Sequence, residues 1–400
     1  MTALQCAYAI ARNTERPLCG FTCQVMLEWS VSPDFNLEKA NRAWFTLCRN
    51  HPALRARMTE DGVLSFAPES EISKIKIFPD SPELSESLVN MLNQRDQTLQ
   101  NGAFFAAAEK QHQITKLFFC MDMLIADPFS FQIILAEFCQ NYLGCPAYGT
   151  MEQKEAEYFS LVWKRDRQQK KTDKLYWQER IKDYAFLKFP VPEDRKFTGS
   201  YLHLTELLEI PVVEDTELIL LSAFLLTMCQ KLHQKKIVIT YPQFGRMHGY
   251  ENCVGDFSPN LFLGFCLDGI ETFQELTEYV QHTVQEDRKH LCFDGTAVQN
   301  LYTRLHKEEV PEETLVFSPS LSRPLIPQEF ESIGKLTEIT SRTPMVSLDA
   351  QAYLHDGKIL LEWVIPENWF RPEQIQDLFS SYCHHCRYFS ILQHQKERIF

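Results

Sequence analysis

The 400-residue sequence lacks the short motifs that mark several common enzyme classes. It contains no G-x-x-x-x-G-K-[ST] phosphate loop, no G-x-G-x-x-G dinucleotide fingerprint and no G-x-S-x-G nucleophile elbow. These absences argue against P-loop, Rossmann-type and α/β-hydrolase chemistry. The longest apolar run, residues 218–229, is too short to span a bilayer and predicts a buried helix.

Positive charge is also scarce. The chain has 40 Lys and Arg against 53 Asp and Glu, a formal net charge of -13. Such a balance argues against general affinity for nucleic acid or anionic membrane, and we expect neither as a partner. The basic run K-R-D-R-Q-Q-K-K at residues 164–171 is a local exception, typical of a solvated helix face or a linker.

The 13 cysteines show no repeated spacing, and no charged leader with an apolar block precedes them. This pattern predicts free thiols in a reducing, cytoplasmic environment. The sequence C-H-H-C at residues 383–386 has zinc-ligand types but no second pair at finger or ribbon spacing, and it lies in a predicted helix. We therefore expect no metal.

A chain of this length predicts two lobes rather than one core. Strand and helix patterns alternate in both halves, so we expect two α/β lobes. The polar segment around residues 164–174 places the boundary, giving lobes 1–167 and 168–400. Predicted helices cover residues 37–51, 130–144, 272–290 and a stretch from about 372; predicted strands cover residues 115–122, 236–242, 260–267, 314–318 and a hairpin, 344–366, turning at 356–357.

One polar stretch lies between two apolar segments: Asp122, Asp127 and Ser130 follow the strand at residues 115–122 and open a helix. Asp127 precedes Pro128, so it could simply be an N-cap with proline at the first helical position. Asp122 ends a buried strand, where an unpaired carboxylate is costly. It needs a donor, a cation or a solvent channel.

The pattern D-x-x-x-x-D-x-x-S resembles the signature of heterocyclization domains of nonribosomal peptide synthetases, which are relatives of condensation domains. Six further stretches resemble motifs of that family, in family order and across almost the whole chain. They are L-Q-C-A-Y-A-I-A-R (4–12), R-N-H-P-A-L-R-A (49–56), P-Q-F-G-R (242–246), V-G-D-F-S-P-N-L-F-L (254–263), T-L-V-F-S-P-S-L (314–321) and S-R-T-P-M-V-S-L-D-A-Q (341–351).

The resemblance implies a fold of two chloramphenicol-acetyltransferase-like lobes in a V, with a central tunnel. Donor and acceptor carrier domains, peptidyl or aryl, would deliver thioesters on phosphopantetheine arms, with no permanently bound cofactor. The implied reaction joins the donor acyl group to a cysteinyl, seryl or threonyl acceptor. It then closes the side chain onto the new amide and expels water, giving a thiazoline or oxazoline in a nonribosomal peptide such as a siderophore.

The resemblance also assigns residues. Asp349 is expected to be the proton shuttle of cyclodehydration, Ser318 to orient it or the departing oxygen, and Gln351 to hold the intermediate from the same strand face. A structural strand-end acid at Asp349 and a surface polar residue at Gln351 are the alternatives. A further set is expected to support the tunnel structurally: Asp122, Asp127, Ser130, Arg246, Asp256 and Thr343.

Two contacts are predicted within that set. Asp127 should pair with Arg246 across the lobes, because condensation-type folds carry such an ion pair. Asp122 should then face the tunnel, within reach of substrate or of Ser130.

Several positions depart from the family pattern. Ser318 replaces threonine, Pro319 replaces serine and Arg342 replaces glutamine. No carrier motif (G-G-x-S) or adenylation motif is present, so we expect the chain to act in trans or to be part of something longer. Two readings stay open: a condensing and cyclizing enzyme, or a reduced relative that only forms the amide or serves as a carrier-binding scaffold.

Overall fold

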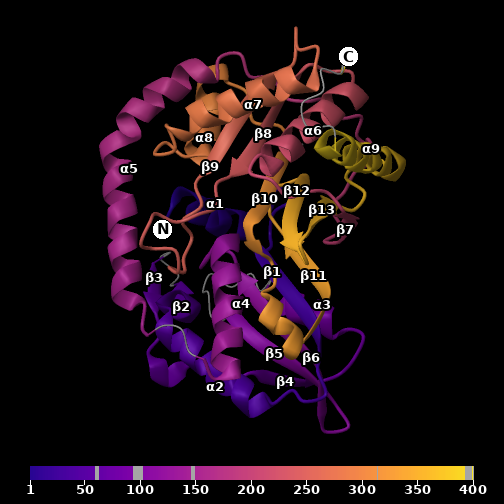
Figure 1. Ribbon diagram of the computed structural model, residues 1–400. Coiled ribbons are helices and arrows are strands. Elements are labelled where there is room, and N and C mark those ends of the chain that lie inside the picture. The colour runs from indigo at the N-terminus through magenta and orange to yellow at the C-terminus, as the bar shows by residue number, and fades with distance from the viewer. Residues whose placement is uncertain (59–62, 93–101, 146–148, 313, 392–398, 400) are drawn as a thin grey trace. The chain divides into compact units, whose positions relative to one another are not determined.

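The computed structural model describes residues 1–58, 63–92, 102–145, 149–312, 314–391 and 399 (Figure 1). The chain forms two compact units. Unit 1 comprises Met1–Val162, Phe244–Ser258 and Leu325–Pro344, and unit 2 comprises Trp163–Gln243, Pro259–Pro324 and Met345–Phe400. Within the described ranges, no helix combines the length and apolar character needed to cross a membrane.

The compact units differ from the predicted lobes 1–167 and 168–400. The first division, after Val162, lies close to the predicted boundary, but two segments of the predicted second lobe belong to unit 1. The physical reason is pairing: Gly334–Arg342 (β11) adds an antiparallel edge strand to Gln24–Val31 (β1). A single cut in the sequence therefore does not describe the division.

Unit 1 is built on a five-stranded sheet in the order β11-β1-β6-β5-β4, beside a small β2-β3 pair. Its remaining elements are α1 (Ala3–Arg12), α2 (Leu37–Asn50), η1 (Pro52–Arg55), β2 (Ala56–Met58), β3 (Leu64–Phe66), η2 (Glu69–Glu71), β4 (Lys76–Pro79), α3 (Leu84–Leu92), β5 (Ala103–Lys110), β6 (Gln113–Asp122), α4 (Pro128–Leu143) and η3 (Gln328–Ser332).

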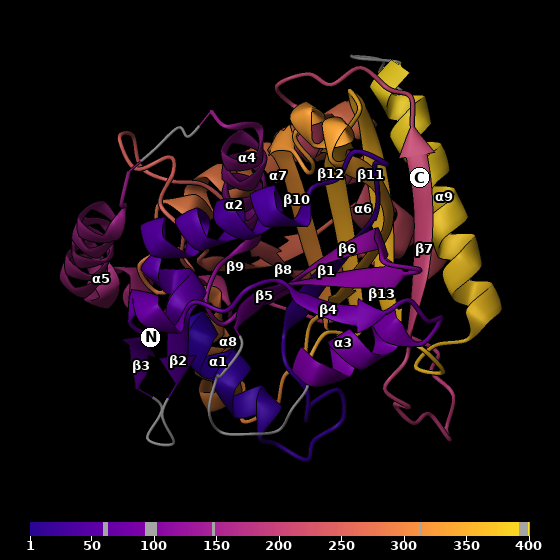
Figure 2. The same cartoon turned by 90° about the horizontal axis from the view of Figure 1, so that it is seen from below.

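Both faces of this sheet are covered. Side chains of α2 and α4 pack with Phe105 and Phe119 on one face, and side chains of α3 pack with Phe104 and Phe118 on the other. Figure 2 shows α2 and α4 on the opposite side of the strands from α3. Because alternate residues of a strand face opposite ways, the apolar run of β6 is buried throughout its second half.

Unit 2 contains a six-stranded sheet in the order β7-β13-β12-β10-β8-β9. Strand β10 runs parallel to both β12 and β8, and the other neighbouring pairs are antiparallel. The elements are β7 (Tyr201–Leu208), α6 (Thr216–Lys231), β8 (Lys236–Pro242), β9 (Asn260–Cys266), α7 (Phe273–Arg288), α8 (Gly295–His306), β10 (Leu315–Pro324), β12 (Leu348–His355), β13 (Lys358–Pro366) and α9 (Pro372–Ile391).

The two faces of the unit 2 sheet differ in character. One face carries Phe317 and Trp363, whose rings pack against Phe224 of the buried helix α6. Helix α9 packs on α6 and beside β7. The alternate residues of the same strands point to the other face, and they include Ser318 and Gln351, which are paired in register.

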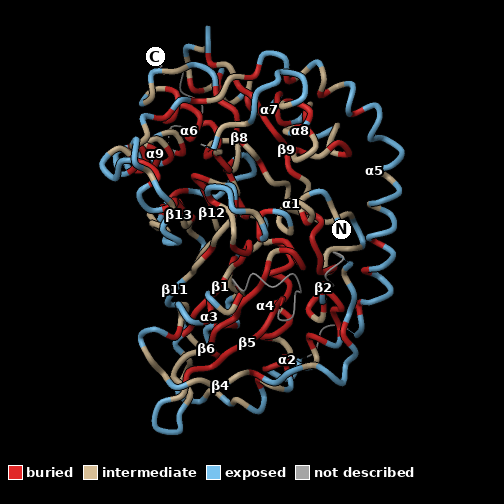
Figure 3. The backbone as a smooth tube through the Cα atoms, turned by 180° about the vertical axis from the view of Figure 1, so that it is seen from behind, coloured by how far each residue is buried: buried red, intermediate tan, exposed pale blue. Residues whose placement is uncertain are grey.

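Helix α5 (Glu152–Arg180) decides between the two interpretations of the basic run, a solvated helix face and a linker. The charged run at residues 164–171 lies inside this 29-residue helix, so it is a solvated helix face. Figure 3 shows most of α5 as exposed. Local charge clustering indicated a break in the chain, whereas these residues are good helix formers that need no core contact.

Several predicted elements are confirmed with their local causes. Helix α4 begins at the N-cap Asp127 with proline following, and ends at Gly144 in the left-handed conformation. The hairpin of β12 and β13 turns at Asp356 and Gly357, both with positive φ, as a two-residue turn matching strand twist requires. The apolar run at residues 218–229 forms the interior of α6.

Candidate functional site

Asp349 and Ser318 are brought together by adjacent parallel strands of unit 2. In the register of β10 and β12, Ser318 lies opposite Gln351, and Asp349 is two residues earlier on the same strand face. The Ser318 hydroxyl donates a hydrogen bond to Asp349 Oδ1, and Gln351 Nε2 donates to Asp349 Oδ2 at 2.7 Å. Both carboxyl oxygens of Asp349 are therefore held by the residues that the sequence singled out.

The environment of Asp349 raises the share of its protonated form above that of an ordinary aspartate. The residue is 7% exposed. Burial, with a smaller contribution from the charge of Glu362, raises its pKa to about 6, against the lowering effect of the Ser318 and Gln351 hydrogen bonds. A carboxyl with such a pKa can both give and accept a proton near neutral pH.

Asp127 is the centre of a separate polar cluster in unit 1. Arg246 donates from Nη1 to Asp127 Oδ2 and from Nη2 to Oδ1, both at 2.8 Å, and both side chains are fully buried. The backbone N–H groups of Ser130 and Phe257 also donate to Asp127, at 2.8 and 3.1 Å. Asp127 thus caps α4, as the structural alternative proposed, and forms the predicted ion pair.

The pair does not join the two units. Asp127 and Arg246 both belong to unit 1, so the expectation of a bridge across the lobes is wrong. The segment Phe244–Ser258 returns to unit 1 although it follows β8 of unit 2 in the chain. Ser130 helps to anchor this segment, because its hydroxyl accepts from Gly255 N–H at 3.0 Å and from Arg246 Nη2 at 2.8 Å.

Asp122 has a partner that the sequence analysis did not name. Arg12, at the end of α1, forms a buried ion pair with Asp122 Oδ2, and the N–H of Leu124 donates to Oδ1 at 2.9 Å. Asp122 is 1% exposed, so the predicted opening of this carboxylate toward substrate or Ser130 is replaced by an internal ion pair. Burial raises the pKa of Asp122, and Arg12 opposes that effect.

Asp256 and Thr343 occupy supporting positions in unit 1. Thr2 donates to Asp256 Oδ2 at 2.7 Å, and Ser258 donates to Oδ1 at 2.9 Å. Burial and the nearby charge of Asp127 raise the pKa of Asp256 to about 6. Thr343 follows β11 and lies 3.9 Å from the thiol of Cys23, Sγ to Oγ1.

The family model of the condensation domain matches residues 19–398. The chain belongs to the condensation-domain family. This family and the two α/β units agree with the two α/β lobes of the predicted fold class.

Two curated synthases resemble most of the chain. Phenyloxazoline synthase MbtB of Mycolicibacterium paratuberculosis is 22% identical over 95% of this chain and 35% of its own length. Bacitracin synthase 1 of Bacillus licheniformis is 22% identical over 96% of this chain and 8% of its own length. The chain therefore spans only a part of these curated synthases.

The fold likeness is extensive. The EpoB cyclization-docking bidomain from Sorangium cellulosum superposes with a TM-score of 0.83 at 19% identity, over 98% of this chain and 83% of that one. The condensation domain from the Monacolin K polyketide synthase MokA superposes with a TM-score of 0.75 at 13% identity, covering 100% of this chain and 98% of that one. At these identities the likeness establishes the condensation-domain fold.

Three functional candidates near Asp349 were not identified from the sequence. Tyr353 donates from its hydroxyl to Gln351 Oε1 at 2.5 Å. Glu362 is paired in register with Gln351, and His203 Nδ1 lies 2.9 Å from Glu362 Oε1. Strand periodicity could have found Tyr353, and the hairpin turn could have found Glu362, which lies as far after the turn as Gln351 lies before it.

A buried histidine cluster was also missed in unit 1. His51 ends α2 and lies between two carboxylates: Nε2 is 2.7 Å from Glu137 Oε2, and Nδ1 is 2.6 Å from Glu155 Oε1. Glu155 Oε1 also accepts from the N–H of Val254 at 2.9 Å. Burial lowers the pKa of His51, but the hydrogen bonds and charges of Glu137 and Glu155 raise it overall to about 9.

The C-H-H-C sequence lies in α9. Cys383 and Cys386 are buried. Burial raises the pKa of the Cys383 thiol to about 12 and that of Cys386 well above its ordinary value, which disfavours the thiolate that a zinc ligand requires. Among the described residues, no group of three or more potential metal ligands gathers at one place.

Proposed function

We propose that this condensation domain joins a carrier-bound acyl donor to a carrier-bound cysteine, serine or threonine and then cyclizes and dehydrates the product. The products would be thiazolines or oxazolines. The likeness to a phenyloxazoline synthase and to a cyclization-docking bidomain supports this class of product. The donor and acceptor would arrive as thioesters on phosphopantetheine arms of partner carrier domains.

The first step needs positioning more than a strong base. The acceptor amine attacks the donor thioester carbonyl, the carbon–sulfur bond breaks, and the released pantetheine thiol takes the proton that the amine loses. Thioesters are reactive toward amines, so holding the two reactants in place supplies much of the acceleration. The stretch from Phe118 to Ser130 contains no histidine, which is consistent with this demand.

The second step needs an acid and a base in one place. The acceptor thiol or hydroxyl adds to the new amide carbonyl, and its proton moves to the carbonyl oxygen. Loss of water then requires a further proton on that oxygen and removal of the proton on nitrogen, which forms the carbon–nitrogen double bond. Asp349 would donate the proton that goes to oxygen and accept the proton that leaves nitrogen, so it ends the cycle as it began.

The observation that carries this proposal is the hydrogen-bonded set Ser318–Asp349–Gln351. Asp349 is buried and its pKa is raised to about 6, which suits alternating acid and base roles. The Ser318 hydroxyl would steer Asp349 or the departing oxygen, and Gln351 would hold the carboxyl and the intermediate. Serine thus retains the hydroxyl that the family pattern supplies as threonine.

A reduced function is the second candidate, and residues of β10 favour it. Ser318 lacks the methyl group that restricts a threonine rotamer, and Pro319 follows it with no backbone N–H. A less restrained hydroxyl would slow water loss more than amide formation. The chain would then form the amide alone or act as a carrier-binding scaffold.

Intact-mass analysis of the loaded carriers distinguishes these functions. The purified chain is mixed with a donor carrier charged with an aryl group and an acceptor carrier charged with cysteine, serine or threonine. Condensation moves the acyl mass onto the acceptor carrier, and cyclization then removes one water. Amide without water loss supports the reduced enzyme, and no transfer with any acceptor supports the scaffold.

A further inference from the structure

Glu362 occupies a costly position in unit 2. It lies on β13 between β12 and β7, and the residue is 2% exposed. His203 contacts its Oε1, but its Oε2 has no hydrogen-bond partner among the described residues. A buried carboxylate oxygen without a partner is destabilising, so an apolar side chain would be more stabilising here.

The strand register places Glu362 on the same sheet face as Asp349. Gln351 is directly opposite Glu362, and Asp349 is opposite Val364, so the two carboxyl groups are diagonal neighbours across β12 and β13. His203 on β7 is opposite Val364 and reaches back to Glu362. The three titratable groups thus follow one another across neighbouring strands.

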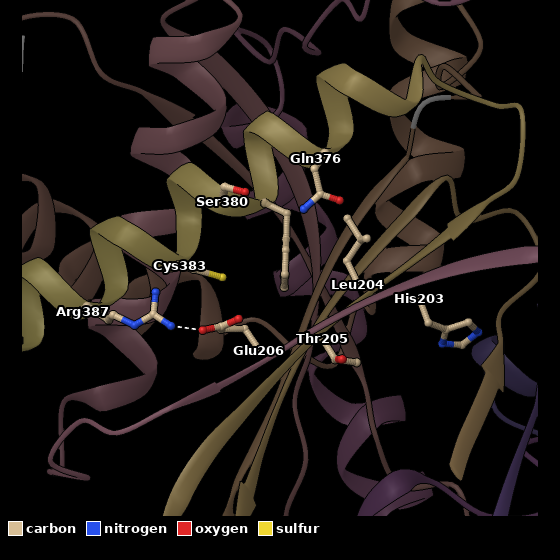
Figure 4. A pocket seen from close by; sticks show the side chains of 9 residues that line it. His203, Leu204, Thr205, Glu206, Gln376, Ser380, Cys383 and Arg387 are labelled. Carbon is tan, nitrogen blue, oxygen red and sulfur yellow. Dashed lines mark hydrogen bonds and ion pairs between the residues drawn. The ribbon is translucent and has the colours of Figure 1, made fainter.

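His203 connects this row to the edge of the sheet. The His203 side chain is 27% exposed, whereas that of Glu362 is 3% exposed. His203 also lines a pocket of about 280 Å³ between β7 and α9, together with Thr205, Glu206 and Arg387. Figure 4 shows Arg387 directed at Glu206, whose side chain points toward α9, while His203 lies farther along the strand. His203 is therefore the member of the row that can exchange protons with solvent.

We propose that Glu362 and His203 form a positioning pair in which Glu362 raises the population of the proton-donating form of Asp349, and His203 moderates this effect and links Asp349 to solvent at the β7 edge. This inference rests on the function proposed above. The Glu362 charge opposes ionisation of Asp349, and His203 weakens that effect whenever it carries its own proton. The pair acts through Asp349 and does not touch the substrate.

Other groups on this face set the background. Tyr353 on β12 faces both carboxyls and remains a phenol, because burial and the charges of Glu362 and Asp349 raise its pKa well above its ordinary value. The nearer polar side chains of the face are hydroxyls that do not titrate near neutral pH: Ser318 and Ser320 on β10, Thr240 on β8 and Thr205 on β7. The same face continues to His355 and Lys358 at the hairpin end, which contact the carboxylates of Asp356 and Glu209, and to Lys236 and Cys266 at the far ends of β8 and β9. Removing the Glu362 charge should therefore act mainly on Asp349.

The direct test measures the protonation of Asp349 without any substrate. The intact chain is labelled at aspartate carboxyl carbons and titrated by NMR, and Asp349→Asn identifies the resonance of interest. Glu362→Gln should lower the titration midpoint of Asp349 by about one pH unit, as expected for a charge at diagonal-neighbour distance in a partly screened site. In Glu362→Asp the Asp349 midpoint should stay close to its wild-type value, because the charge is kept.

The two remaining variants sharpen the result. His203→Gln removes a side chain that can carry a positive charge beside Glu362 and should move the Asp349 midpoint upward, opposite to Glu362→Gln. Glu206→Gln, in the same pocket but on the α9 side, should leave it unchanged. An Asp349 midpoint that ignores Glu362→Gln, or that falls in His203→Gln, would overturn the positioning role.

An activity arm separates this inference from the proposed function. In single turnovers with loaded carriers at pH 7, Glu362→Gln should slow water loss about tenfold and spare amide formation. If Glu362→Gln shifts the Asp349 midpoint but the wild-type chain never loses water, the electrostatic pair is supported and cyclodehydration is contradicted. If the wild type loses water but Glu362→Gln leaves the midpoint unchanged, cyclodehydration is supported and the electrostatic pair is contradicted.

Discussion

His51 should make unit 1 less stable as the pH becomes alkaline. Its imidazolium is held between Glu137 and Glu155, and its pKa rises from 6.5 to about 9. A rise of that size corresponds to about 3 kcal/mol of stabilisation. Because the folded pKa lies above the unfolded one, this contribution is complete below pH 6.5 and is lost as the pH rises through 9.

The perturbation is His51→Gln, which keeps hydrogen-bonding capacity but removes the charge. Below pH 6.5 the free energy of unfolding of the variant should be about 3 kcal/mol lower than that of the wild type, since two buried carboxylates lose their shared cation. Above pH 9 the wild type has lost its proton, so the difference should shrink toward zero.

Urea unfolding at a series of pH values, followed by circular dichroism, measures this difference. His248→Gln is the matched control in the same unit, because the His248 side chain is fully exposed although it contacts Glu251. The control curve should run parallel to the wild type at every pH. A His51→Gln curve that is also parallel to the wild type would refute a charged, stabilising His51.

Two buried ion pairs of unit 1 give further predictions. Arg246→Met should cost about 3–5 kcal/mol in urea unfolding, because it leaves the Asp127 carboxylate buried without its cation, whereas Arg57→Met at a surface pair should cost less than about 1 kcal/mol. A loss at Arg246 as small as that at Arg57 would contradict the role given to the buried pair. Arg12→Met should cost a similar 3–5 kcal/mol at pH 7 and less at pH 5, where Asp122 can take up a proton. An equal loss of stability at pH 7 and pH 5 would contradict a cost that depends on the charge of Asp122.

The fold could be predicted where local signals and family motifs agree. Asp127 before Pro128 indicated the start of α4, and the turn at 356–357 indicated the β12–β13 hairpin. The division into units could not be read from composition, because it depends on where β11 pairs. Strand pairing between residues 24–31 and 334–342 is a long-range event that no local pattern encodes.

The candidate site could be predicted in its named residues but not in its full network. Motif order identified Asp349, Ser318 and Gln351, and strand register brings them together. Glu362 and His203 belong to no quoted motif, and their place depends on the pairing of β13 with β12 and β7. Partners contributed by neighbouring strands become visible only when the register is known.

The most direct test of the account compares Asp349→Asn with the wild type in single turnovers monitored by intact mass. The matched control is Asp356→Asn, on the exposed turn of the same hairpin. Asn at position 349 cannot shuttle a proton, so we expect this variant to form the amide without releasing water, while the control does both. Release of water by Asp349→Asn at the wild-type rate would contradict the proposed chemistry.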